Sequence, residues 1–194
     1  MALDPIRATE IVAMLLGVAY VVLAALRNRW CWVPGAVSSA LVAALSFKRE
    51  LPMQAALNVY YVGMAAYGYW NWTRSSSAGE LRVGTLGWRW HLLAAVCIVP
   101  LSWVTAGILA RETQAAWPLL DSLTTWFSLF ATWLVARARI ENWIYWIIID
   151  GVLVYLFYMQ DLPFLAGLFA ILAVVALAGF IGWQRRLKAQ AVPA

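Results

Sequence analysis

Long apolar runs separated by short charged segments follow one another along the whole chain. A helix needs about 20 predominantly apolar residues to cross a bilayer. Strands of a membrane β-barrel would instead alternate apolar and polar residues over about ten positions. The runs here are continuously apolar, and a helix satisfies its own backbone hydrogen bonds in lipid. We therefore predict an all-α membrane protein with seven transmembrane helices. They are Thr9–Leu26, Trp32–Phe47, Ala55–Trp72, Trp90–Leu109, Trp117–Ala136, Trp143–Met159 and Pro163–Trp183.

The composition is typical of a protein that crosses the bilayer several times. Of the 194 residues, 64% are hydrophobic and 12% are charged, whereas a soluble domain is about 45–50% apolar and about 25% charged. These charges are too few to cover a water-facing surface, which excludes a soluble enzyme, a secreted disulfide scaffold and a disordered tail. The lipid bilayer is therefore the first expected partner.

Basic residues are distributed unequally between the two ends of the predicted helices. The side with the N-terminus and the loops after the second, fourth and sixth helices has four of the 14 lysines and arginines, and the other side has ten. Because cytoplasmic loops carry an excess of Lys and Arg, we predict the N-terminus outside and the C-terminus in the cytoplasm. The net charge of +5 is then a topology signal, and no nucleic-acid partner is expected.

The first three and the last three predicted helices resemble two copies of one unit. An offset of 113 places Trp30 on Trp143 and Trp70 on Trp183. Two three-helix units joined directly would point in opposite directions, so the single helix Trp90–Leu109 between them makes the two copies parallel. Transporters built from parallel repeats bind their substrate near the midplane, between the repeats. We therefore predict a 3+1+3 arrangement of two parallel three-helix repeats and a linker helix. The predicted segments are a first repeat at 1–73, a cytoplasmic loop with the linker helix at 74–112, and a second repeat with a basic tail at 113–194.

Polar side chains recur at helical spacing within the fifth predicted helix. Asp121, Thr124, Thr125, Ser128 and Thr132 form one stripe, because their spacing follows the period of an α-helix. Two interpretations of the hydroxyl groups are open: they line a cavity, or they only form hydrogen bonds between packed helices.

Two further helices carry a polar or aromatic face. Asn58 and Tyr61 share a face of the third helix, and Trp143, Trp146 and Asp150 share a face of the sixth. Asp150 lies about nine residues from the cytoplasmic end, which is roughly 12–14 Å deep at about 1.5 Å per residue, and a lone carboxylate at that depth costs several kcal/mol. Trp143 as an interfacial residue and Asp150 as a structural residue remain open alternatives. Together the three faces favour a cavity for a flat ligand that is uncharged or monocationic.

The sequence offers few of the groups that catalysis or metal binding requires. It has one histidine, His91, and two distant cysteines, Cys31 and Cys97, which make no metal-binding cluster. It contains no phosphate-binding loop, and no histidine base accompanies a nucleophile. We therefore predict no enzyme activity, no catalytic residue, no metal site and no cofactor.

Several segments resemble the signature of a known family. These are Asp-Ser-Leu-Thr-Thr at 121–125, the Glu-Asn-Trp-x-x-Trp element at 141–146, and Asp150 after it. In the first half, Asn58 and Tyr61 fall where the family has Q-x-x-Y, and Tyr67-Gly68-Tyr69-Trp70 falls where it has Y-G-W. The chain thus resembles the PnuC-type (Pnu family) vitamin transporters over nearly its whole length, and most closely those that carry nicotinamide riboside.

The resemblance implies a fold, a transport mechanism and partners. The family fold has two parallel three-helix repeats joined by a fourth helix and is related to the SWEET sugar transporters. Transport in the bacterial inner membrane is facilitated diffusion without ion coupling, and a cytoplasmic kinase traps the nucleoside by phosphorylation. The resemblance also implies a homo-oligomer, a trimer. Thiamine or riboflavin as the vitamin, a SWEET-like sugar carrier, and a non-transporting membrane subunit are the alternatives.

The resemblance also gives roles to matching residues. Trp143 and Trp146 would stack on the substrate ring. The other substrate contacts that we predict are polar side chains, at Asn58, Tyr61, Thr124, Thr125, Ser128 and Asp150. Two positions depart from the family pattern: Asn58 is one methylene shorter than the usual Gln, and Tyr69 stands where Trp is usual.

Overall fold

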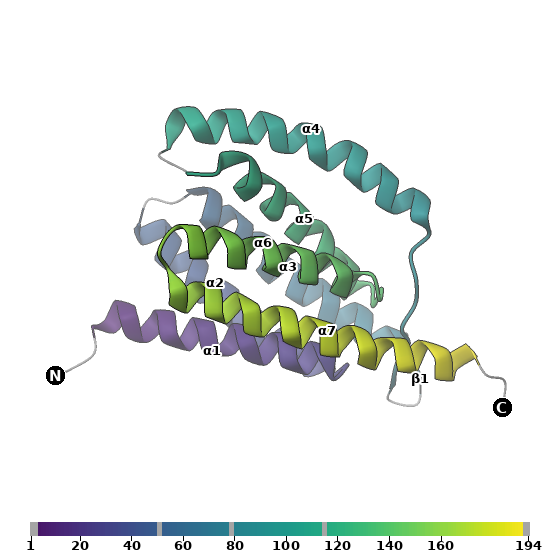
Figure 1. Ribbon diagram of the computed structural model, residues 1–194. Helices are drawn as coiled ribbons and strands as arrows, with labels where there is room; N and C mark the ends of the chain where they lie inside the picture. The colour runs from purple at the N-terminus through teal and green to yellow at the C-terminus, as the bar shows by residue number, and fades with distance from the viewer. Residues whose placement is uncertain (1–3, 50–51, 78–79, 114–115, 192–194) are drawn as a thin grey trace. The chain divides into compact units, whose positions relative to one another are not determined.

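The computed structural model describes residues 4–49, 52–77, 80–113 and 116–191 (Figure 1). In these ranges the chain forms seven long helices, which confirms the predicted helices. They are α1 (Pro5–Ala25), α2 (Trp32–Lys48), α3 (Pro52–Ser75), α4 (Trp88–Glu112), α5 (Pro118–Ala136), α6 (Asn142–Met159) and α7 (Pro163–Ala191). A short 3-10 helix, η1 (Arg29–Cys31), precedes α2. A hairpin of two antiparallel two-residue strands, β1 (Ser76–Ser77) and β2 (Glu80–Leu81), follows α3. The largest difference from the prediction is in α7, which continues past Trp183 into the basic tail.

Six of the described helices are long and apolar enough to cross a membrane: α1, α2 together with η1, and α4 to α7. The chain is therefore a multi-pass membrane protein. The helix α3 is long enough but more polar, because it carries Asn58, Asn71 and several tyrosines. Its role as a seventh span stays a prediction.

The chain divides into two compact units. Unit 1 comprises Met1–Arg82, Ala136–Ala138 and Gly182–Ala194, and unit 2 comprises Val83–Val135 and Arg139–Ile181. The two units are defined by their internal contacts, and the predicted segments 1–73, 74–112 and 113–194 stay a prediction.

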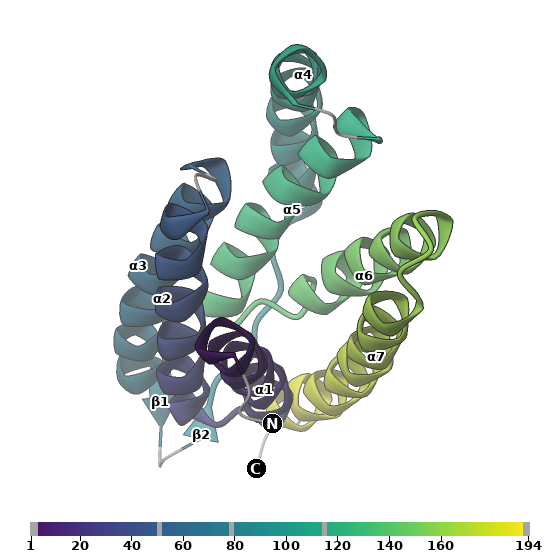
Figure 2. The same ribbon diagram turned by 90° about the vertical axis from the view of Figure 1, so that its left-hand side faces the viewer.

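In unit 1, α2 packs beside α1 and α3 (Figure 2). Aromatic side chains form a row in its core. The ring centroids of Tyr20 and Trp32 lie 5.5 Å apart, those of Trp32 and Trp72 5.4 Å, and those of Trp72 and Trp183 5.9 Å. The three tryptophans are at most 3% exposed. The ring of Trp32 lies so close to Gly68 that a Cβ at that position would overlap it. Aromatic packing thus joins α1, α2 and α3 to the end of α7.

The turns that end α1 and α5 have the same unusual backbone. Arg27 has φ 59° and Ala138 has φ 52°. In the first turn the amide of Asn28 donates to the carbonyl of Leu23, and in the second the amide of Arg139 donates to that of Leu134, both at 2.9 Å. This pattern, in which an amide reaches back five residues past a left-handed residue, is the Schellman ending of a helix.

The two turns are separated by a sequence offset that recurs elsewhere in the chain. The differences 138 minus 27 and 139 minus 28 are both 111. The same 111 separates Pro163, the first residue of α7, from Pro52, the first residue of α3. The second triplet of helices therefore follows the first at one constant offset.

The offset of 113 expected from the tryptophans is wrong by two residues. At 111, Trp143 corresponds to Trp32 and not to Trp30. Trp143 and Trp32 are 2% and 3% exposed, whereas Trp30 is 53% exposed. Tryptophans stand at 30 and 32, and again at 70 and 72, so a slip of two residues also pairs Trp with Trp. The sequence alone therefore cannot distinguish an offset of 111 from one of 113, whereas the burial of Trp32 and Trp143 favours 111.

Corresponding helices of the two triplets make similar contacts within unit 1, although the bonded residues are one position away from strict equivalence. The indole Nε1 of Trp183 donates to the carbonyl of Ala24 at 3.2 Å, so the end of α7 is joined to the end of α1. The side-chain Nδ2 of Asn71 donates to the carbonyl of Ala136 at 2.8 Å, so the end of α3 is joined to the end of α5. In each case the third helix of one triplet bonds to the first helix of the other.

Candidate functional site

The polar stripe predicted on α5 is present, with its hydroxyl protons directed to its own backbone. Thr124 donates to the carbonyl of Leu120 at 2.8 Å, and Thr125 donates to that of Asp121 at 2.7 Å. Each hydroxyl therefore keeps its oxygen lone pairs free to accept a hydrogen bond. Ser128 is 8% exposed and one turn farther along the helix. The stripe is suited to groups that donate hydrogen bonds, such as an amide NH₂ or a sugar hydroxyl.

On α6, one aromatic ring is buried and the next is partly accessible. Trp143 is 2% exposed, and its ring packs against Gly179 of α7, where a Cβ would lie 2.8 Å from ring carbons. Trp146 is half-buried. Both side chains point to one face of the helix because they are three residues apart.

The carboxylate of Asp150 lies one turn beyond Trp146 on the same face. The residue is 4% exposed. Among the residues of unit 2 that the structure describes, no basic side chain forms an ion pair with it. A buried carboxylate without a cation is costly, so this position favours a cationic ligand or a proton.

Asn58 and Tyr61 lie on α3, in unit 1. Asn58 is 6% exposed, and its Nδ2 donates to the carbonyl of Gln54 at 2.9 Å. This bond leaves the amide oxygen as the group available to a ligand. Tyr61 is half-buried and lies beside Tyr60, with ring centroids 5.9 Å apart.

The segment before α4 is held by residues whose role the sequence did not predict. The amide of Leu86 donates to Oε1 of Glu141 at 2.8 Å, and Nη1 of Arg139 donates to the carbonyl of Thr85 at 2.9 Å. The amide of Ile140 donates to the carbonyl of Gly84 at 3.0 Å. We call residues 83–87, held in this way against residues 139–141, the strap. Glu141, the first residue of the predicted Glu-Asn-Trp-x-x-Trp element, thus binds a backbone amide and need not touch a substrate.

After the strap, an aromatic contact joins the beginning of α4 to α6. Nδ1 of His91 and the hydroxyl of Tyr145 lie 3.0 Å apart and share a hydrogen bond. Their rings are stacked, with centroids 5.8 Å apart and planes at 23°. Tyr145 also stacks on Phe127 of α5 at 5.9 Å. The start of α6, which carries Trp143 and Trp146, is therefore fixed to both α4 and α5.

Comparison with known proteins gives a consistent assignment. The sequence model described as "Nicotinamide mononucleotide transporter" matches residues 7–185. The chain is 27% identical to the nicotinamide riboside transporter PnuC of Escherichia coli (strain K12), over 90% of this chain and 84% of the relative. It is 24% identical to the riboflavin/roseoflavin transporter RibM of Streptomyces davaonensis, over 95% of this chain and 88% of the relative.

A solved structure supports the fold. The crystal structure of the vitamin B3 transporter PnuC matches with a TM-score of 0.74 and 22% sequence identity, over 96% of this chain and 84% of that chain. The relatives are transporters and not enzymes, and the predicted resemblance is confirmed. Because the sequence model extends over nearly the whole chain, this multi-pass membrane protein belongs to the nicotinamide mononucleotide transporter family.

Proposed function

We propose that the protein carries nicotinamide riboside across the bacterial inner membrane by facilitated diffusion without ion coupling. A cytoplasmic kinase then phosphorylates the riboside and makes uptake irreversible. The observation that carries the proposal is the face of α6 that places half-buried Trp146 one turn from buried Asp150. The riboside has a flat, positively charged pyridinium ring, and such a ring is attracted both to an indole face and to a carboxylate. The similarity to PnuC of Escherichia coli supports this substrate.

The proposed contacts divide by chemistry. Trp146 stacks on the pyridinium ring, and Asp150 faces its charge. Trp143 packs against Gly179, and stacking by this ring as well stays part of the proposal. The acceptors that we propose for the carboxamide and the ribose hydroxyls are the side-chain oxygens of Asn58, Tyr61, Thr124, Thr125 and Ser128.

We also propose the 3+1+3 arrangement, with the N-terminus outside, the C-terminus in the cytoplasm and a homo-oligomeric assembly, a trimer. The constant offset of 111 supports two copies of one triplet. The bonds of Trp183 to Ala24 and of Asn71 to Ala136 support parallel copies, because in each bond both residues lie in the C-terminal halves of their helices.

Riboflavin is a second candidate substrate. The similarity to the riboflavin/roseoflavin transporter RibM favours it. Riboflavin has a flat ring system that would also stack on Trp146, but its ring carries no positive charge for Asp150 to face. The two substrates therefore make different demands on the carboxylate.

Uptake into proteoliposomes tests the proposal. Radiolabelled riboside, riboflavin and thiamine are offered without any ion gradient to the wild type, to Trp146→Ala and to Trp103→Ala. Trp103 on α4 is 65% exposed and serves as the matched control. We expect riboside uptake by the wild type and by Trp103→Ala, and at least about a tenfold loss in Trp146→Ala from the lost ring contact. Uptake that requires an imposed proton or sodium gradient would contradict the uncoupled mechanism. Equal uptake by Trp146→Ala and the wild type would contradict the stacking role.

A further inference from the structure

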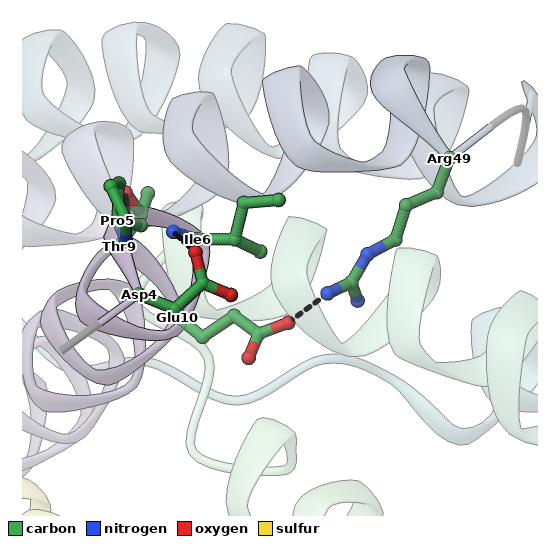
Figure 3. Close-up of polar contacts among 6 residues, drawn as sticks. All are labelled: Asp4, Pro5, Ile6, Thr9, Glu10 and Arg49. Atoms are coloured by element: carbon green, nitrogen blue, oxygen red, sulfur yellow. Dashed lines mark hydrogen bonds and ion pairs between the residues drawn. The ribbon is translucent and has the colours of Figure 1, made fainter.

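An ion pair closes one end of the first triplet. The guanidinium of Arg49, the residue that caps the end of α2, bonds to the carboxylate of Glu10 on α1 (Figure 3). The side chains are 52% and 41% exposed, respectively. The pair joins the beginning of α1 to the end of α2, and it neutralises the acid at that end.

The second triplet keeps the acid and lacks the base. At the offset of 111, Glu10 corresponds to Asp121 and Arg49 corresponds to Gln160. Asp121 lies in the first turn of α5, and Gln160 caps the end of α6 as Arg49 caps the end of α2. Trp117, just before α5, contacts Tyr155 in the second half of α6, with ring centroids 6.4 Å apart. The position equivalent to Arg49 thus holds a neutral amide in the second triplet.

Among the described residues of unit 2, no other cation is paired with Asp121 in place of the missing arginine. Arg139 is bonded to the strap, and Arg89 lies at the opposite end of α4. Arg111, in the last turn of α4, forms no ion pair with Asp121 among the described residues. The hydroxyls of Thr124 and Thr125 bond to the backbone carbonyl of Asp121, which leaves its carboxylate to other partners.

The carboxylate of Asp121, which forms no ion pair with a described residue, lies at the beginning of the polar stripe. Thr124 and Thr125 follow it after one turn of α5, and Ser128 after two. Asp121 is half-buried, so its charge is partly shielded from water and partly accessible to a solute. A charge at the mouth of a path raises the local concentration of solutes with the opposite charge.

We propose that Asp121 is a specificity-determining residue that recruits monocationic substrates to the α5 stripe. This inference rests on the proposed transport of nicotinamide riboside, which is such a cation. Glu10 cannot do the same, because Arg49 neutralises it. An acid in the first turn also stabilises its helix through the helix dipole, and the experiment has to separate that effect from recruitment.

The test measures the salt dependence of riboside transport in liposomes of zwitterionic lipid. The variants are Asp121→Asn, which removes the charge, and Gln160→Arg, which places a guanidinium at the position equivalent to Arg49. Glu112→Gln is the matched control, because it removes an exposed acid at the C-terminal end of α4, nine residues before Asp121 in the sequence. We expect the KM of the wild type and of Glu112→Gln to rise with ionic strength, because salt screens the attraction.

For Asp121→Asn and Gln160→Arg we expect a KM about 3- to 10-fold higher at low salt, a flat salt dependence and an unchanged kcat. A KM for Asp121→Asn equal to that of the wild type, in a wild type that carries riboside, overturns the inference and leaves the proposed function standing. A lower thermal stability of Asp121→Asn with no change in salt dependence also overturns it, since that result assigns Asp121 to the helix alone. A wild type that carries no riboside refutes the proposed function, and recruitment of that cation falls with it.

Discussion

Gly179 on α7 and Trp143 on α6 are in direct contact through the indole ring, because a Cβ at position 179 would lie 2.8 Å from ring carbons. Gly68 and Trp32 repeat this relationship in unit 1 at the same offset of 111. A glycine inside a helix costs about 0.5–1 kcal/mol relative to alanine. Two glycines at equivalent positions, each covered by a tryptophan, indicate that the close approach of ring and backbone outweighs this cost.

The Gly179→Ala variant is therefore expected to destabilise the protein by about 1–3 kcal/mol, because the added methyl overpacks the contact with Trp143. Thermal unfolding in detergent, followed by tryptophan fluorescence, measures the effect. Gly167→Ala on the same helix is the control, since nothing lies within 4 Å of a Cβ there. That control should be neutral or more stable. If Gly179→Ala unfolds at the same temperature as Gly167→Ala, the packing role assigned to Gly179 is wrong.

Trp143 and Trp146 are expected to respond differently to replacement. Trp143→Ala should cost about 3–5 kcal/mol of stability, as should Trp32→Ala, because each removes a buried ring. Trp146→Ala should cost less, since Trp146 is only half-buried, and its main effect should be on riboside uptake. Thermal unfolding and uptake measured on the same preparations separate the two effects. Trp146→Ala could instead lose as much stability as Trp143→Ala while its folded fraction transports riboside at the wild-type rate. That result would make Trp146 a packing residue and would contradict its proposed contact with the substrate.

The helices could be predicted because continuous apolar runs depend only on residue type. The register of the repeat could not, because Trp30 and Trp32 are the same residue type and only burial separates them. The strap was missed for another reason: Glu141 binds the amide of Leu86, and any residue except proline would supply such an amide. The polar stripe on α5 was predicted from its spacing, but the direction of its hydroxyls required coordinates.

Removing the carboxylate of Glu141 is expected to loosen the strap. Glu141→Ala leaves the Leu86 amide without its acceptor and should cost about 1–3 kcal/mol. Glu141→Gln keeps an oxygen acceptor at the same place and should cost less. Hydrogen exchange of the peptide that contains residues 83–91 reports the change, and Glu112→Ala at the far end of α4 is the control. Unchanged exchange in Glu141→Ala would show that the strap is held without this bond.

The ion pair between Arg49 and Glu10 is expected to contribute little to stability, despite its close contact. Its side chains are 52% and 41% exposed, and pairs so open to solvent are typically worth about 0–1 kcal/mol. Glu10→Gln, Arg49→Gln and the double variant form a cycle that isolates the interaction between the two charges. Thermal unfolding at low and high salt should give a coupling energy below about 1 kcal/mol that decreases as salt screens it. A larger coupling that salt does not reduce would mean that the pair is shielded from water, and the first triplet would then depend on it to hold α1 against α2.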